Sequence, residues 1–349
     1  MSQPPGLQPP GLQPPPGPHR RRNLLTGEWV LVSPHRLDRP WQGERQPPPA
    51  PAAPYDPQCY LCPGNTRAGG AVNPAYTDVY AFDNDYPALL SESTAPETPG
   101  LLQAEAETGV CRVLCYAPEH NLTLGQLPAE GIRRVVDLWA DQYAELATRP
   151  DIEAVTIFEN RGAMMGASNP HPHGQVWATS SVPTALATVD ATQRAYFAAH
   201  GRPLLMDYLA QERAEGVRIV AENEHAAALV PFWAVWPYET MVLPRRAVAA
   251  LPDFTCAERD ALASLLKSLF GAYDAAFDTS TPYSMGWRQR PAKDTHAPHF
   301  VAHLAIHPPL VRPPSVRKFM VGFEMFGMPQ RDLTAETAAA RLRAAFPQS

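Results

Sequence analysis

The sequence lacks a long apolar run, an excess of positive charge and a large, even set of cysteines. No apolar stretch approaches the ~18 residues that cross a bilayer, and the proline-rich start has no hydrophobic segment behind a charged one. We therefore expect a cytoplasmic protein that does not bind membranes. The net charge of -6 argues against a nucleic-acid partner, because general nucleic-acid binders are usually basic. Five cysteines in 349 residues favour reduced thiols or a metal site over a disulfide framework.

The length and the order of apolar segments predict two domains behind a proline-rich arm. Repeats of "PPGLQ" favour extended polyproline conformations that bury little apolar surface, so residues 1–19 are expected to be a disordered arm. The expected domains cover residues 20–183 and 186–346. Short strands and amphipathic helices, such as the helix predicted at 129–147, are typical of an α+β fold with a mainly antiparallel sheet. The strand predicted at "HFVAHLAIHPP", residues 299–309, parallels "NPHPHGQVW" and indicates an internal duplication.

The stretch "SNPHPHGQVW", residues 168–177, carries the strongest signal for chemistry. Side chains alternate between the two faces of a strand, so His171, His173 and Gln175 are expected to share one face. Proline and glycine weaken strands, which indicates that the stretch is selected for a position rather than for strand stability. The two histidines could merely satisfy buried backbone groups. Three polar side chains on one face are costly without a function, however, and this favours a reactive site.

The residue types in this stretch suit the transfer of a phosphoryl-linked group. An imidazole has a pKa of ~6.5 and keeps one nitrogen lone pair free when the other nitrogen donates to a fixed acceptor. Its attack on phosphorus gives a covalent phosphoramidate. Gln175 can donate a hydrogen bond to a phosphoryl oxygen but cannot protonate a leaving group. The expected leaving group therefore departs as an anion, as a sugar phosphate does.

Long, ordered motifs carry a resemblance to a known family. They are "RRNLLTGEWVLVSPHRLDRPWQG", "CYLCPGN", "FDNDYPAL", "FENRGAMMGASNPHPHGQVWATS", "PYSMGW" and "VRKFMVGFEM". Together they closely resemble the galactose-1-phosphate uridylyltransferases of the histidine-triad superfamily. The resemblance implies two histidine-triad-like domains, related by duplication. It also implies a nucleotidyltransferase of galactose metabolism, which converts UDP-glucose and galactose 1-phosphate into UDP-galactose and glucose 1-phosphate by a ping-pong mechanism. Hydrolases of the superfamily have a third histidine at the position of Gln175.

The resemblance assigns roles to individual residues. His173 matches the nucleophile that becomes uridylylated, and Gln175 matches the residue that binds the transferred phosphoryl group. The other matched substrate contacts are Arg36, Arg39, Asn84, Asp85, Asn160, Gly166, Ser168, Lys318, Val321, Phe323, Glu324 and Gln330. Those beyond residue 317 lie where the family's second half reaches into its neighbour's active site, which implies a homodimer with shared sites. Ala167 and Phe323 depart from the usual cysteine and tyrosine, and Phe323 puts the affinity for hexose phosphate in doubt.

A zinc site is expected around the CxxC motif. Cys59 and Cys62 have the spacing that allows both thiolates to meet one tetrahedral zinc, although the spacing alone leaves a redox pair open. The resemblance supplies His120 and His171 as the remaining ligands of a closed, structural Cys2His2 site. Cys111 and Cys115 are four residues apart on a predicted strand, hence ~13 Å apart, too far to share one ion. With Cys256, they are predicted to be core thiols.

A second metal is predicted to be absent. Some members of the family hold one with a glutamate and three histidines, whose matched positions here are Val189, Arg288, His303 and Ala305. One ligand survives, and the charge of Arg288 repels a cation. Asp190 is adjacent, but a shift of one residue along a helix turns a side chain by ~100°. His299, His303 and His307 would be ~13 Å apart along a strand and could not share one ion.

Two alternatives to the uridylyltransferase hypothesis stay open. One is a nucleotide-sugar or dinucleoside polyphosphate phosphorylase that uses the same histidine chemistry, although Lys318 and Glu324 favour a hexose phosphate as acceptor. The other is a catalytically dead, zinc-stabilised binding protein. It is disfavoured because His173, Gln175 and Ser168 are all present.

Overall fold

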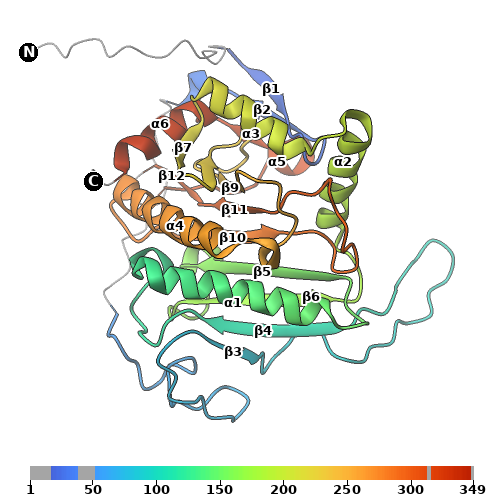
Figure 1. Cartoon of the computed structure of the whole chain (residues 1–349), viewed down its shortest axis with the longest axis vertical. Helices are drawn as coiled ribbons and strands as arrows, with labels where there is room; N and C mark the ends of the chain where they lie inside the picture. Colours follow the sequence, from blue (N-terminus) through green and yellow to red (C-terminus); the bar gives the residue numbers. More distant parts are fainter. Residues whose placement is uncertain (1–16, 38–51, 313–315, 347–349) are drawn as a thin grey trace, which may run out of the picture.

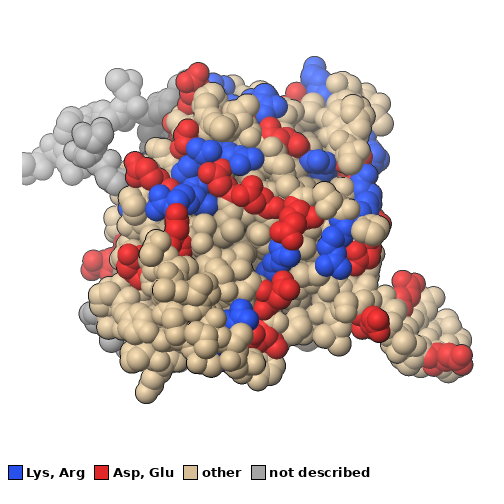
Figure 2. Space-filling view, turned by 60° about the horizontal axis from the view of Figure 1, so that its bottom comes forward, with Lys and Arg blue, Asp and Glu red and all other residues tan. Residues whose placement is uncertain are grey.

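The computed structural model describes residues 17–37, 52–312 and 316–346. Most of the expected arm and Arg39 lie outside the described residues, and the first strand already begins at His19. In the described part of the chain, no helix has the length and apolar character needed to cross a membrane. Figure 2 shows a face on which acidic and basic side chains are interspersed, with acidic side chains on the segment that projects from the body.

Nine strands among the described residues form one antiparallel sheet that runs through the whole molecule (Figure 1). Their order across the sheet is β3-β4-β6-β5-β10-β11-β9-β8-β7. Their bounds are β3 Tyr80–Asp83, β4 Gly109–Cys115, β5 Ala154–Arg161, β6 His173–Thr179, β7 Ile219–Glu222, β8 Ala226–Leu229, β9 Thr240–Pro244, β10 Tyr283–Arg288 and β11 His303–His307.

The expected internal duplication is present in the order of the elements. The first half runs β3-β4-α1-β5-β6 and the second runs β8-β9-α4-β10-β11, with α1 at Ala129–Ala147 and α4 at Cys256–Phe277. The two halves join where β5 pairs antiparallel with β10, with Phe158 opposite Gly286. This pairing relates the halves by an approximate twofold rotation about that residue pair. A residue of one half can therefore be matched to its counterpart in the other by position.

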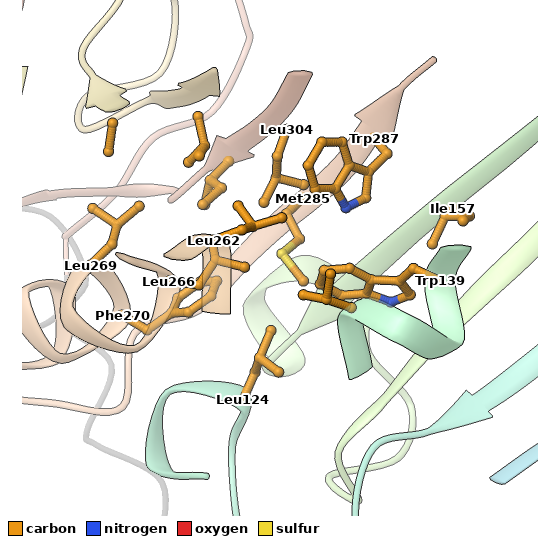
Figure 3. Packing of buried hydrophobic residues seen from close by; sticks show 14 of the residues in the cluster. Leu124, Trp139, Ile157, Leu262, Leu266, Leu269, Phe270, Met285, Trp287 and Leu304 are labelled. Atoms are coloured by element: carbon orange, nitrogen blue, oxygen red, sulfur yellow. The ribbon is translucent and has the colours of Figure 1, made fainter. Parts of the chain in front are cut away.

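The helices α1 and α4 cover one face of both halves. The periodic apolar residues of α1 are buried, as its predicted helical spacing requires: Ile132, Val135, Val136, Trp139 and Tyr143. They pack against strand residues of both halves and against leucines of α4, so one core lies across the joint of the duplication (Figure 3). In that view the side chains of Trp139, Ile157, Met285 and Trp287 converge with Leu262 and Leu266. The C-terminal helix α6, Ala335–Ala345, adds to this core.

The opposite face is covered unevenly. Over the second half lie α2 (Thr184–His200), α3 (Leu204–Glu215) and a small sheet of β1 (His19–Arg22), β2 (Trp29–Val32) and β14 (Gln330–Arg331). Their apolar residues pack on Met241 and Leu243 of β9, whereas Val242 belongs to the core under α4. Alternate residues of one strand thus serve opposite faces. No helix in the described ranges contributes to a core on this face of β5 and β6, where His173 lies.

The predicted strand at residues 299–309 is wrong at its start. The strand β11 begins at His303, because two preceding amides are bound elsewhere: Val301 N donates to Gln193 Oε1 at 3.0 Å and Ala302 N donates to Val248 O at 2.7 Å. Three short elements follow: β12 at Leu310–Arg312, β13 at Val316–Arg317 and the single-turn helix α5 at Phe323–Phe326.

Candidate functional site

His173 is the first residue of β6 and is held in one tautomer by the backbone. Its Nδ1 lies 2.7 Å from the carbonyl oxygen of His171. Because a carbonyl can only accept, Nδ1 carries the proton and Nε2 keeps its lone pair. Burial lowers the pKa of His173, so the ring is neutral near pH 7. The result is a half-buried imidazole with a free nucleophilic nitrogen.

Two side-chain amides accompany His173 on the same face of the sheet. Gln175 follows on β6, and its Oε1 accepts a hydrogen bond from Trp177 Nε1 at 3.3 Å. Asn160 is the last residue but one of the adjoining strand β5, and its Oδ1 accepts from Ser284 Oγ at 2.7 Å. Since both amide oxygens are occupied, both NH2 groups remain to donate to an oxyanion. Sequence reasoning missed the roles of Trp177 and Ser284, although both lie inside the motifs that identified the site.

The connection from β5 to β6 contains the predicted Gly166 and Ser168. Gly162 and Gly166 adopt positive φ angles of 81° and 78°, which glycine reaches without the strain of a Cβ atom. Between them Ala163–Met165 forms a single 3-10 turn. Ser168 is exposed in the same loop. The structure thus brings Asn160, Gly166, Ser168, His173 and Gln175 into one strand–loop–strand unit.

The four expected metal ligands come together and are buried. The Sγ atom of Cys62 lies 3.6 Å from Nδ1 of His120 and 3.6 Å from Nδ1 of His171. With Cys59, all four donor atoms lie within 4.8 Å of one another. A tetrahedral zinc with ordinary Zn–S and Zn–N bonds separates sulfur from nitrogen by about 3.6 Å. The distances and the donor set therefore fit a Cys2His2 zinc site.

The surroundings of this group orient its ligands. Nε2 of His171 lies 3.0 Å from the carbonyl oxygen of Ala117, so Nε2 donates there and Nδ1 faces the thiols. Asn169 donates to Cys59 Sγ at 3.4 Å and accepts from the backbone N of His171 at 2.9 Å. Burial raises the pKa of Cys62 to about 11. A divalent cation would supply the charge that allows such a thiol to be buried as thiolate.

The remaining predicted substrate contacts fall into two groups. Asn84 and Asp85 follow β3, with Asp85 3.5 Å from Arg67. The larger group lies beside β14, where Lys318 Nζ donates to Glu324 Oε1 at 2.7 Å and to the carbonyl oxygen of Gln330 at 3.1 Å. Its other charged pair is Arg36 with Asp332, at 3.6 Å. Among the described residues, no hydrogen bond or ion pair links either group to the β5–β6 unit. Val321 and Phe323 are exposed.

The positions matched to a second metal hold no complete ligand set within the described chain. His303 is fully buried, and Arg288 lies beside it on the neighbouring strand β10. Val189 is a residue of α2 and packs in the core that α2 shares with α3. Only two of the three histidines considered as replacements lie in β11, because His299 precedes it in a turn. His299 instead lies 2.7 Å from Asp190, a contact that the expected rotation of Asp190 did not anticipate.

Asp294 joins Asp190 and His299, so that their donor atoms lie within 4.8 Å of one another. Arg194 contacts Asp190 at 3.1 Å and Asp294 at 2.7 Å. A guanidinium thus already balances both carboxylates, and the absence of a second metal stays a prediction.

Comparisons with known proteins agree with this geometry. Models for the N-terminal and C-terminal domains of galactose-1-phosphate uridyl transferase match residues 15–183 and 189–348. Proteins named galactose-1-phosphate uridylyltransferase are similar over most of the chain. The one from Haemophilus influenzae is 49% identical, covering 94% of both chains, and the one from Rattus norvegicus is 48% identical, covering 93% of this chain and 87% of its own.

Solved structures share the fold. A uridylyltransferase superposes with a TM-score of 0.76 at 27% identity, covering 93% of this chain and 97% of its own. An ADP-glucose phosphorylase from Arabidopsis thaliana with bound ADP-glucose gives 0.75 at 22% identity, covering 94% and 99%, a likeness of fold alone.

Proposed function

Because the chain belongs to the galactose-1-phosphate uridylyltransferase family, we propose that it exchanges uridylyl between UDP-glucose and galactose 1-phosphate. The products are UDP-galactose and glucose 1-phosphate, and the enzyme works in the cytoplasm. The observation that carries the mechanism is the contact between His173 Nδ1 and the carbonyl oxygen of His171 at 2.7 Å. It leaves Nε2 as the one unprotonated ring nitrogen, directed away from the backbone.

The reaction has two displacements at the same phosphorus. In the first, Nε2 of His173 attacks the α-phosphorus of UDP-glucose, a P–N bond forms, and the P–O bond to glucose 1-phosphate breaks. The electron pair leaves on the phosphate oxygen of glucose 1-phosphate. In the second, a phosphate oxygen of galactose 1-phosphate attacks the phosphorus and the P–N bond breaks. Neither leaving group needs a proton, which suits a site with Gln175 beside the nucleophile.

The side-chain amides of Gln175 and Asn160 are proposed to stabilise the negative charge on the phosphoryl group. Gln175 and Asn160 each have their oxygen occupied, so their NH2 groups donate to the oxygens that gain charge in the transition state. The hydroxyl of Ser168 and the loop amides around Gly166 add donors. Trp177 and Ser284 are positioning residues, since they act through the amides that they bind.

The zinc has a structural part in this proposal. Its ligands would be Cys59, Cys62, His120 and His171. When bound, the zinc would tie the CxxC turn to the segment just before β6 through its coordination bonds. The carbonyl of His171 in turn fixes the tautomer of His173. Loss of the ligand His171 would therefore loosen the contact that prepares the nucleophile.

A second copy of the chain completes the site. The segment that holds Lys318 and Glu324 makes no hydrogen bond to the β5–β6 unit among the described residues. It also exposes apolar side chains: Phe319 56%, Val321 58%, Phe323 55%, Met325 67% and Phe326 89%. An exposed apolar segment next to a partly buried Lys–Glu pair suits a partner's surface better than water. We infer a homodimer in which this segment reaches the neighbour's His173.

Intact mass spectrometry after incubation with UDP-glucose tests the proposal. A covalent uridylyl adduct is expected on the full-length protein, and it should disappear when galactose 1-phosphate is added. A parallel incubation with ADP-glucose separates the phosphorylase alternative, which would give an adenylyl adduct instead. Absence of any adduct, in protein that binds UDP-glucose, would favour a catalytically dead binding protein.

A further inference from the structure

A cavity of about 330 Å³ lies across the joint of the two halves, beside the site described above, and Ser284 belongs to its lining. Its lining comes from β5, β10, β11 and the start of α2, and includes Thr156, Leu186, Arg288 and His307. It shares a sheet face with the candidate site, since Phe158 lies opposite Gln175 on one side and Gly286 on the other. The strand β5 lies between β10, which carries Arg288, and β6, which carries the nucleophile (Figure 1).

The duplication makes the side of this cavity that holds Arg288 the counterpart of the candidate site. The twofold relation exchanges Phe158 with Gly286, so the residue two places further along each strand is also exchanged. Asn160 on β5 therefore corresponds to Arg288 on β10. Where the first half presents a neutral amide to a phosphoryl oxygen, the second half presents a guanidinium.

Arg288 has no counter-ion. Within the described chain it makes no hydrogen bond and no ion pair within 4.0 Å, and no aspartate or glutamate lines the cavity. The carboxylate of Glu239 acts on it at longer range, and that carboxylate is already bound to the backbone N of Val235 at 2.7 Å. Glu239 also lies 3.7 Å from His307. A partly buried cation without a partner is costly, and an anion in the cavity would relieve this cost.

We propose that this cavity is a second anion site, which binds a phosphate group. The guanidinium fork of Arg288 matches the oxygens of a phosphate and can donate two parallel hydrogen bonds. The hydroxyl of Thr156, which has no partner among the described residues, is a further donor on the cavity wall. Phe158 and Leu186 give the cavity apolar sides that weaken competition from water. The ligand is inorganic phosphate or the phosphate of a phosphomonoester such as glucose 1-phosphate.

Isothermal titration of the full-length protein with inorganic phosphate tests the site, with saturating UDP present to occupy the proposed active site. The wild type should bind phosphate in a saturable way. Two variants should weaken this binding at least about tenfold: Arg288→Gln, which removes the cation, and Ala185→Trp, which fills the cavity from an exposed position of α2. Arg134→Gln, a matched loss of a guanidinium on α1, should bind as the wild type does.

Further titrations distinguish the ligands. Glucose 1-phosphate binding more tightly than inorganic phosphate would identify a phosphomonoester as the ligand, and the reverse order would identify free phosphate. The assignment to phosphate is overturned if acetate binds equally tightly, if UDP abolishes phosphate binding in the wild type, or if both variants retain it. Ala185→Trp keeps the test decisive should Arg288→Gln fail to fold. Turnover is not measured, so the result is independent of the proposed uridylyl transfer.

Discussion

The strands β6 and β11 are counterparts in the duplication, and they begin with the same histidine contact. In β6, Nδ1 of His173 bonds the carbonyl oxygen two residues earlier at 2.7 Å, and in β11, Nδ1 of His303 does the same with Val301 at 3.0 Å. The two histidines nevertheless differ in access. His303 is fully buried, and its Nε2 has no hydrogen-bond partner within the described structure. The backbone of the repeat thus fixes the tautomer in both halves, while only the ring of His173 is partly exposed.

The neighbours of the two histidines complete the difference. The twofold relation matches Gln175 with Ala305 and His171 with Val301. The first half has an amide donor and a candidate metal ligand where the second half has a methyl group and a valine packed against α2 and α3. The proposed catalytic site of the first half therefore differs from its counterpart by the side chains at a few strand positions, rather than by a different fold. Each prediction below changes one of these matched positions or another residue of the strands β5 and β6.

Replacing the two histidines separately should have the largest effect. His173→Ala is expected to fold normally and to lose adduct formation, with turnover reduced by roughly 10⁴-fold or more, because no other group replaces a missing nucleophile. His303→Ala is the matched control and should still form the uridylyl adduct from UDP-glucose. Label exchange between UDP-glucose and glucose 1-phosphate measures both. Exchange that survives in His173→Ala would contradict the assignment of the nucleophile.

The start of β6 should depend on a metal where the start of β11 depends on packing. His171→Ala is expected to lose zinc and activity together. It should also lose stability, by about 4 kcal/mol if zinc is present at 1,000 times its Kd. Elemental analysis of chelator-washed protein measures the zinc content, and urea unfolding at that zinc concentration measures the stability. Cys256 is exposed at the first residue of α4, so its predicted place in the core is wrong. Cys256→Ala removes this thiol and should leave both unchanged. A full equivalent of zinc retained by His171→Ala would show that the four residues do not form the site.

The core beneath the two strands differs at Glu159, whose counterpart is Trp287. Burial raises the pKa of Glu159 to about 7, and Tyr283 donates to its Oε1 at 3.1 Å. The native state binds this proton more tightly than the unfolded chain does. The resulting stabilisation is complete below pH 4.5 and is lost as the pH rises toward 7. Glu159→Gln cannot titrate, so about 3 kcal/mol of pH dependence should disappear from its free energy of unfolding. Urea unfolding across this range measures it, and an unchanged slope would assign the titration to another group.

Sequence reasoning found the parts of this comparison that depend on local pattern. The apolar spacing of α1 is confirmed, and so are the duplication and the approach of the four metal-ligand candidates. Sequence reasoning could not predict the contacts that depend on how strands distant in the sequence pair with one another. The pairing of β5 with β10 makes one sheet of two expected domains, and it also brings Ser284 to Asn160. The start of β11 was missed because its deciding bonds come from Gln193 and Val248.

The smallest expected effect concerns the amide that the second half lacks. Trp177→Phe keeps an aromatic ring near Phe158, whose centroid lies 5.8 Å from that of Trp177, but removes the N–H that binds Gln175 Oε1. The loss of one hydrogen bond of about 1 kcal/mol predicts a fall in kcat of about fivefold, with a smaller change in KM for UDP-glucose. If Trp177 acts through Gln175, the same substitution should have no further effect in a Gln175→Ala background. Single-turnover rates of adduct formation in the four proteins of this cycle measure the coupling. Additive effects of the two substitutions would show that Trp177 contributes by packing alone.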